Sequence, residues 1–176
     1  MCTGVIRRNA HLSAFALRPG TIADADQVVS LNTGSVALTS PMDGDRFEYL
    51  FGLSSLVTVA EADGRVVAFL IAMADGAAYE SGNYQWFAKR IKRFVYVDRV
   101  VVSPDCRGDG IGSALYAHTK SWAKQAGLPS MVAEMNLDPP NVGSLNFHKR
   151  RGFLQIGTRA VDSAKTVSMQ VLSIQD

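Results

Sequence analysis

The sequence predicts an α+β fold with α/β/α layers: a mixed, mostly antiparallel sheet of six to seven strands, flanked by about four helices. Two hairpin signals and one strand-helix-strand crossover indicate it. Hairpins pair strands antiparallel, whereas a crossover through a helix brings two strands together in parallel. The expected hairpins join residues 55–61 to 65–74 and 153–161 to 165–172, and the crossover runs from 94–102 through 110–126 to 130–135.

Composition sets the class of protein. The 176 residues are 47% hydrophobic and 19% charged, which excludes a disordered, collagen-like or coiled-coil chain. We expect one domain over residues 14–176 after a tail at 1–13, which has no hydrophobic period. A net charge of +2 gives no bulk attraction to nucleic acid.

The lack of an expected membrane span and of an expected signal peptide predicts the localisation. The longest apolar run, residues 66–74, is too short to cross a membrane, and the amino-terminal segment has no continuous apolar stretch typical of a signal peptide. Cys2 and Cys106 form no paired-cysteine motif. We therefore expect a cytoplasmic protein with reduced thiols, no membrane partner and no metal site.

The elements of the first half follow from caps and turns. Residues 14–18 are predicted as a short strand ended by Pro19 and Gly20. Thr21 and Asp24 resemble a capping box at the start of a helix over 23–31. Asp43 is expected to cap a second helix through residue 51, and Asp63 with Gly64 forms the tight turn of the first hairpin.

Residues 75–93 show no clear period. Aromatic residues stand here among glycine and polar residues, followed by four basic residues. Such aromatics could form a wall of an acceptor pocket, although packing in the core is the commoner role. The basic residues are expected on a solvated face. The aromatic residues are Tyr79, Tyr84, Trp86 and Phe87.

The most informative segment is the turn between the strand at 94–102 and the helix at 110–126. It holds Arg107, Gly108, Gly110 and Gly112. Glycines let the backbone approach a ligand closely, and a helix start offers unpaired N–H groups and a positive dipole end. Arg107 adds a charge suited to phosphate. The pattern indicates a pyrophosphate site, and the alternative is a tight turn that binds nothing.

Known phosphate motifs fit this turn poorly. A Walker A loop needs Gly-Lys-Ser/Thr at its end, but Gly112 is followed by Ser113 and Ala114. A dinucleotide fingerprint needs a third glycine at the position of Ser113.

The segment Val102–Gly112, with Arg107, Gly110 and Gly112 at its centre, resembles the signature of the GNAT superfamily of acyl-CoA N-acyltransferases. A second segment, Asn141-x-x-Ser-x-x-Phe-His-x-x-x-Gly-Phe153, is similar to the next helix of that family. The resemblance covers residues 15–172 and implies an acetyl-CoA-dependent N-acetyltransferase. It also implies that the strands at 94–102 and 130–135 splay apart.

For the co-substrate, acetyl-CoA, the resemblance implies a pyrophosphate bound on the amides of residues 107–112, beside Ser113. The pantetheine arm would pair with the backbone of the strand at 94–102, where the Val100 N–H would meet the acetyl carbonyl and stabilise its growing charge. Asn141 would contact the pantetheine amide, cap its helix, or do both. The implied binding residues are Val100, Val101, Val102, Arg107, Gly108, Asp109, Gly110, Ile111, Gly112, Ser113, Asn141, Ser144 and Phe147.

Four residues are candidates for the chemistry: His148, Asp98, Val100 and Glu134. His148 stands where the family often has a tyrosine that protonates the leaving thiolate; an imidazolium could do this, and the alternative is a structural histidine. Asp98 alternates with Val100 and Val102, so we expect one shared face and a carboxylate able to accept the amine proton. Its alternative is an ion pair, and Glu134 is the second candidate base.

The expected reaction is acetyl transfer to a primary amine of a small molecule or peptide, by direct attack in a ternary complex. A homodimer is possible. Three alternatives remain open at this stage: a non-catalytic acyl-CoA sensor, a binder of a different nucleotide, and an interaction module.

Overall fold

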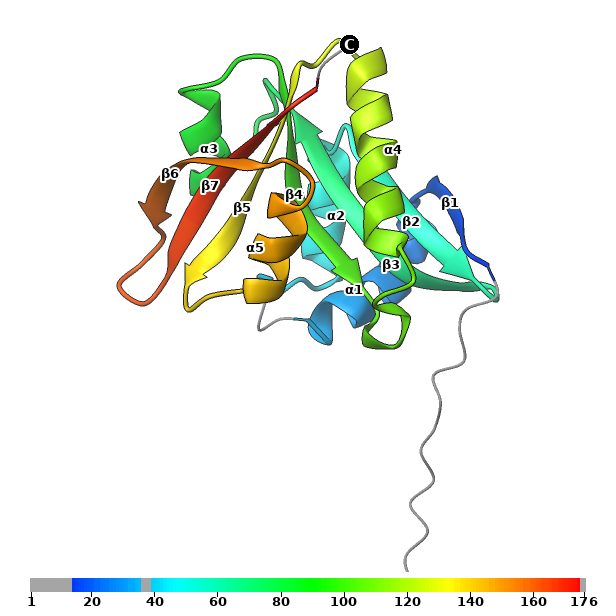
Figure 1. Ribbon diagram of the computed structural model, residues 1–176. Coiled ribbons are helices and arrows are strands. Elements are labelled where there is room, and N and C mark those ends of the chain that lie inside the picture. Colours follow the sequence, from blue (N-terminus) through cyan, green and yellow to red (C-terminus); the bar gives the residue numbers. More distant parts are fainter. Residues whose placement is uncertain (1–13, 36–38, 175–176) are drawn as a thin grey trace, which may run out of the picture.

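A computed structural model describes residues 14–35 and 39–174, so the predicted tail at 1–13 lies outside the described residues. Seven strands form one sheet in the order β1-β2-β3-β4-β5-β7-β6 (Figure 1). Among these strands, only β4 and β5 pair in parallel, which confirms the mixed, mostly antiparallel sheet. The strands are β1 (Ala16–Pro19), β2 (Leu56–Ala62), β3 (Arg65–Ala74), β4 (Phe94–Val102), β5 (Ser130–Asp138), β6 (Leu154–Ala160) and β7 (Thr166–Ser173).

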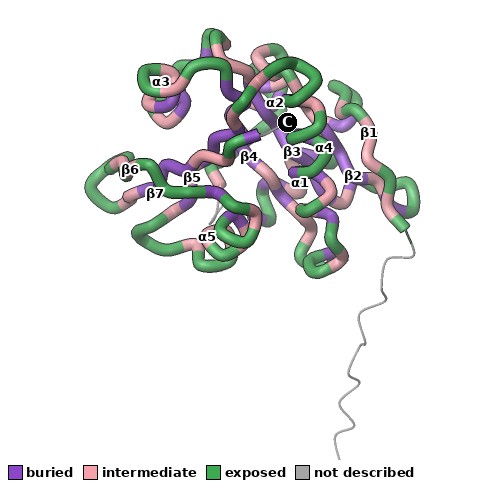
Figure 2. The backbone as a smooth tube through the Cα atoms, turned by 45° about the horizontal axis from the view of Figure 1, so that its top comes forward, coloured by how far each residue is buried: buried purple, intermediate pink, exposed green. Residues whose placement is uncertain are grey.

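Helices cover both faces of the sheet, as an α/β/α layering requires. One buried cluster joins the sheet to α1, α2 and α3, and a second joins the opposite face to α4 and α5. Figure 2 shows that burial concentrates in the central strands, whereas β6 at the sheet edge is largely exposed. The helices are α1 (Ala25–Thr33), α2 (Gly44–Leu53), α3 (Gly82–Ala88), α4 (Ile111–Gln125) and α5 (Val142–Lys149).

Local signals place most element boundaries. Thr21 and Asp24 form the expected capping box, although it opens a 3-10 turn that leads into α1. The Asp43 carboxylate accepts the Arg46 N–H at 2.8 Å at the start of α2. Asp63 and Gly64 both have positive φ, 50° and 72°, as a type I′ hairpin turn requires.

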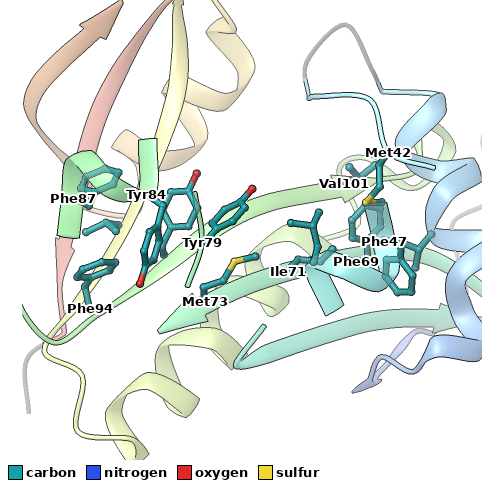
Figure 3. Close-up of a cluster of buried hydrophobic side chains, with 14 of the residues drawn as sticks. Met42, Phe47, Phe69, Ile71, Met73, Tyr79, Tyr84, Phe87, Phe94 and Val101 are labelled. Carbon is teal, nitrogen blue, oxygen red and sulfur yellow. The ribbon is translucent and has the colours of Figure 1, made fainter. Parts of the chain in front are cut away.

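Helix α3 was not predicted, and it lies in the aromatic segment without a clear period. Its Tyr84 and Phe87 are almost fully buried and pack with Phe94 and Tyr96 at ring distances of 5.6–6.0 Å (Figure 3). These two aromatics therefore belong to the core, whereas Tyr79 also reaches a cavity. Tertiary packing, which sequence periodicity does not report, stabilises this seven-residue helix.

β4 and β5 pair over only three residues each. The parallel ladder joins Phe94–Tyr96 to Ser130–Val132, and no later residue of β4 has a partner on β5. The two strands splay from Val97 onward, as the fold prediction required. The gap between them opens toward the start of α4, where the glycine-rich turn lies (Figure 1).

β4 also carries a bulge that corrects one expectation. Arg99 and Val97 face Ile71 and Ala72, two consecutive residues of β3, so Asp98 is the extra residue. Before the bulge Tyr96 faces the α1–α2 side, and after it Val100 packs on the α4 side. Asp98 therefore does not share a face with Val100 and Val102, and the prediction that it does was wrong.

No helix of the described residues is both long and apolar enough to cross a membrane.

Candidate active site

The glycine-rich turn leaves backbone donors at the start of α4. Gly108 and Gly110 have positive φ, 99° and 82°, and Gly110 is the residue just before the helix. The first helical hydrogen bond runs from the Ala114 N–H to the Gly110 carbonyl at 3.0 Å. The N–H groups of residues 111–113 precede it and have no carbonyl one turn earlier within the helix. This is the geometry of an anion site.

Gly112 lets α5 approach this turn closely. A Cβ at Gly112 would lie 3.2 Å from the Phe147 ring, a distance tighter than ordinary packing. The Arg151 guanidinium stacks on the Phe147 ring, 3.3 Å from its centroid, and donates to the Ser113 hydroxyl. Arg151 thus brings a second guanidinium, after Arg107, to the cavity wall beside the turn. Arg151 directly precedes the Gly-Phe pair, but no sequence signal identified it as a site residue.

A cavity of about 840 Å³ runs from this turn along the β4–β5 gap to the α1–α2 side of the sheet. All of the predicted site residues line it except Asp109. Asn136 lines it too, as do Arg46 and Tyr116, which the sequence analysis did not select. The structure therefore gathers residues from β4, β5, α4 and α5 around one space.

Backbone donors of β4 face the gap. The Ser103 N–H donates to the Val67 carbonyl at 2.9 Å, so it points toward β3. Because N–H directions alternate along a strand, the N–H groups of Val102 and Val100 point away from β3, to the side of β5. There β5 has already diverged, so these two donors border the cavity.

Glu134 of β5 carries the unusual carboxylate of the site. Its Oε1 accepts from Asn83 at 2.8 Å and from the Tyr96 hydroxyl at 3.0 Å. Its Oε2 is buried and has no hydrogen-bond partner among the residues that the structure describes. Burial raises the pKa of Glu134 from its usual value to about 7, and the nearby Asp98 charge acts in the same direction.

Asn83, on the unpredicted helix α3, sets the orientation of Glu134. Its Oδ1 accepts from the Arg159 guanidinium at 2.7 Å. Because arginine can only donate, this bond leaves the Asn83 amide nitrogen facing the glutamate. Asn83 is a positioning residue that no sequence signal identified.

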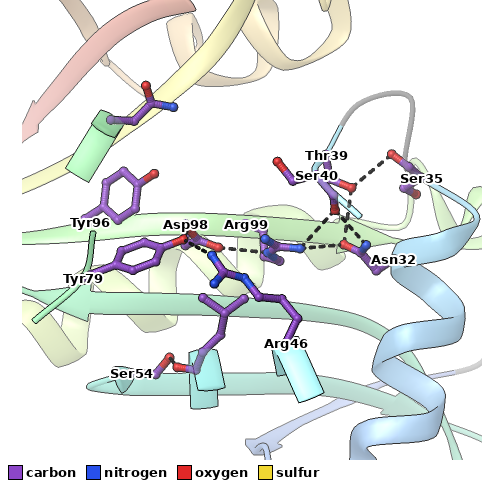
Figure 4. Close-up of polar contacts among 12 residues, drawn as sticks. Asn32, Ser35, Thr39, Ser40, Arg46, Ser54, Tyr79, Tyr96, Asp98 and Arg99 are labelled. Atoms are coloured by element: carbon purple, nitrogen blue, oxygen red, sulfur yellow. Dashed lines mark hydrogen bonds and ion pairs between the residues drawn. The ribbon is translucent and has the colours of Figure 1, made fainter. Parts of the chain in front are cut away.

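Both carboxylate oxygens of Asp98 accept hydrogen bonds from protein side chains. One oxygen accepts from the Tyr79 hydroxyl at 2.7 Å and the other from Arg99 Nε at 2.9 Å (Figure 4). Arg99 is itself held by Asn32 of α1 and by the Ser40 carbonyl. The ion-pair alternative for Asp98 is therefore present in the structure, and Tyr79 and Arg99 bond one oxygen each.

His148 is buried and both ring nitrogens have partners. Nδ1 lies 2.8 Å from the Ser144 carbonyl, which can only accept, so Nδ1 carries the hydrogen and Nε2 accepts from the Tyr116 hydroxyl at 2.7 Å. Burial lowers the pKa of His148 to about 4. The ring is therefore neutral at pH 7, with its one hydrogen on Nδ1 and directed at the Ser144 carbonyl.

Two further residues of this region have structural surroundings. The Asn141 side chain accepts the Ser144 N–H at 3.0 Å and caps α5. Cys106 lies beneath the turn, where burial raises the pKa of its thiol, which disfavours the thiolate. The described residues include no group of three or more His, Cys, Asp or Glu that could hold a metal ion.

Comparison with known proteins agrees with this geometry. A sequence model described as the acetyltransferase (GNAT) family matches residues 27–153. The chain therefore belongs to the GNAT acetyltransferase family.

One curated relative and two solved structures illustrate the similarity. MJ1207 of Methanocaldococcus jannaschii, named as an uncharacterized N-acetyltransferase, is 31% identical over 96 residues, which make up 54% of this chain and 37% of that protein. Ard1 from Thermoplasma volcanium has a TM-score of 0.74 and 18% identity, over 93% of this chain and 99% of its own. The protein yncA from Salmonella typhimurium, solved with its cofactor acetyl-CoA, has a TM-score of 0.69 and 20% identity, over 93% and 96%.

Proposed function

We propose that this protein transfers an acetyl group from acetyl-CoA to a primary amine, by direct attack of the amine while both substrates are bound. One observation carries the proposal: the anion site at the start of α4 opens into the β4–β5 gap, which is lined by free backbone donors and reaches the half-buried Glu134, whose Oε2 is buried. Membership of the family and a structural neighbour that holds acetyl-CoA support it.

The residues present fit acetyl-CoA. The glycines at 108 and 110 and the N–H groups of residues 111–113 suit the pyrophosphate, and Arg107 and Arg151 add positive charge beside it. The N–H groups of Val102 and Val100 are donors for the amide and carbonyl groups of an extended ligand in the gap. When bound, acetyl-CoA supplies the acetyl group as an activated thioester.

We assign proton acceptance from the amine to Glu134. A general base works best when its pKa lies near the working pH, and the pKa of Glu134 is about 7. Its Oε2 has no protein partner among the described residues, whereas Tyr79 and Arg99 engage the two oxygens of Asp98. The Val100 N–H is the proposed donor to the acetyl oxygen, since such donors contribute about a hundredfold or more in rate.

Burial of His148 disfavours the imidazolium needed to protonate the sulfur that leaves, so this role stays a prediction. A role as proton donor predicts that His148→Ala lowers kcat with little change in acetyl-CoA affinity. A kcat that is unchanged by this substitution across the pH range would remove His148 from the mechanism.

The test is a thiol-release assay with acetyl-CoA and a panel of amino acids, polyamines, aminoglycosides and peptides with free amino termini. The proposal predicts amine-dependent thiol release, with the acetylated product identified by mass spectrometry. If no amine releases thiol, melting experiments show which alternative holds. Stabilisation by acetyl-CoA alone would indicate a sensor, stabilisation by NAD or ATP but not by CoA a different nucleotide site, and no stabilisation an interaction module; each would reject the proposed reaction.

A further inference from the structure

Arg46, on α2, is a half-buried cation that faces the α1–α2 end of the cavity. Its guanidinium lies 4.8 Å from the centroid of the Tyr49 ring and 5.9 Å from that of Tyr79. Its one side-chain hydrogen bond, to the Tyr79 hydroxyl, is long at 3.4 Å. In the described part of the chain, no carboxylate pairs with it. Most of its five donors are therefore available to a ligand.

Arg99, which lines the same cavity, differs from Arg46 in its hydrogen-bond partners. Arg99 is buried and donates to Asp98, to Asn32 and to the Ser40 carbonyl (Figure 4). The two oxygens of Asp98 are engaged by Arg99 and Tyr79, so this carboxylate does not pair with Arg46. This end of the cavity carries an excess positive charge, and a partly buried charge is stabilised when an anion pairs with it.

The excess cation lies a short way from the proposed base. Arg46 contacts the Tyr79 hydroxyl, the Tyr79 and Tyr96 rings are 6.4 Å apart, and the Tyr96 hydroxyl binds Glu134. The groups suited to an anion and to an amine are therefore separated by two packed tyrosine side chains along one wall. A molecule that carries both an anionic group and an amine could place one group at each end of this wall.

We propose that the acceptor is a small amine that carries a carboxylate, with the carboxylate bound by Arg46 and the amine directed toward Glu134 and Val100. This inference rests on the proposed function and names the substrate class of the same cavity. A guanidinium fork binds a carboxylate through two parallel hydrogen bonds, and the two tyrosine rings hold that fork in place.

The experiment compares acids with their uncharged amides. The panel holds the common amino acids, β-alanine and γ-aminobutyrate, each beside its carboxamide. Binding to the CoA-loaded protein is measured by calorimetry, and thiol release from acetyl-CoA is measured in parallel. We expect at least one acid to bind at least tenfold more tightly than its amide, and Arg46→Gln to reduce that ratio at least tenfold.

Two further variants keep the test specific. Arg90 is an exposed arginine that also stacks on an aromatic ring, 4.1 Å from the Trp86 centroid, so Arg90→Gln is the matched control and should leave the ratio unchanged. Arg46→Lys keeps the charge but loses the fork, and it should retain part of the preference. Circular dichroism and melting curves establish that each variant is folded.

The outcomes separate this inference from the proposed function. Equal binding of acids and amides, or a ratio that Arg46→Gln does not change, overturns the inference even if uncharged amines release thiol. Acids that bind through Arg46 without any thiol release would support the carboxylate site and reject the transfer reaction.

Discussion

Two carboxylates border the same cavity but have different hydrogen-bond partners. Asp98 is neutralised by Arg99 and hydrogen-bonded by Tyr79. Glu134 has only neutral partners, Asn83 and Tyr96, and one buried oxygen without a described partner. Burial without a compensating cation is what raises the pKa of Glu134 to about 7. At the residue scale, hydrogen bonds thus engage both oxygens of Asp98 but leave one oxygen of Glu134 without a described partner.

Glu134→Gln should lower kcat by about 10²–10⁴-fold, because the amide cannot accept the amine proton. Wild-type activity should rise with pH through about 7 as the carboxylate ionises, and the variant should lose that rise. The check is the pH profile of kcat/KM. Activity within threefold of wild type, or a profile with the same rise, would contradict the assignment.

The same substitution should stabilise the folded protein at high pH. The pKa of Glu134 is higher in the folded state, so wild-type stability falls as pH rises through about 7. Glutamine carries no charge, so the melting temperature of Glu134→Gln should exceed that of wild type at pH 8 by about 2–5 °C, and the difference should shrink at pH 5. A variant that is less stable than wild type at pH 8 would argue against a buried carboxylate.

His148 gives a second prediction at this scale, with the opposite sign. Its pKa of about 4 in the folded state lies below the usual value of about 6.5, so stability should decline as pH falls from about 6.5 toward 4. An NMR titration should find a neutral ring with hydrogen on Nδ1 at pH 6. Titration near pH 6.5, or hydrogen on Nε2, would contradict the contact with Tyr116.

The sequence could identify Glu134 and His148 as candidates, but it could not rank them. Their pKa values are shifted chiefly by burial, and the hydrogen-bond partners Asn83, Tyr96 and Tyr116 come from elements distant in the chain. Arg46 was not predicted either, because an arginine on a short amphipathic helix is typical of an ordinary surface residue.

At the scale of elements, β4 shows what a local pattern can and cannot establish. Its predicted bounds, residues 94–102, match the structure at both ends. The alternation of its side chains does not hold, since the bulge at Asp98 shifts the later residues to the other face. A bulge depends on the pairing of β4 with β3, which leaves no local signature in the sequence of β4.

Two glycines of the turn before α4 should resist substitution for different reasons. Gly110→Ala places a side chain at a φ of 82°, and Gly112→Ala places a Cβ 3.2 Å from the Phe147 ring. Each should lower the free energy of unfolding by about 1–2 kcal/mol, measured by urea denaturation. Gly44→Ala is the matched control: it begins α2 with nothing within 4 Å of its Cβ, and should be neutral or slightly stabilising. Equal effects at all three positions would contradict this account.

Across the whole molecule, the layering could be predicted because hairpins and one crossover dictate it. The strand order places β7 between β5 and β6, a choice set by packing of the closing hairpin on β5. The splay followed from family resemblance alone, since both strands read as ordinary β-runs. It is this splay, with the turn beside it, that converts a layered fold into a site for an extended ligand.

The most direct test of the central claim is residue-resolved amide hydrogen exchange, by NMR, with and without saturating acetyl-CoA. We expect the N–H groups of Val100, Val102 and residues 111–113 to become protected when the ligand binds. Binding of acetyl-CoA with unchanged exchange at these amides, and protection elsewhere, would contradict it.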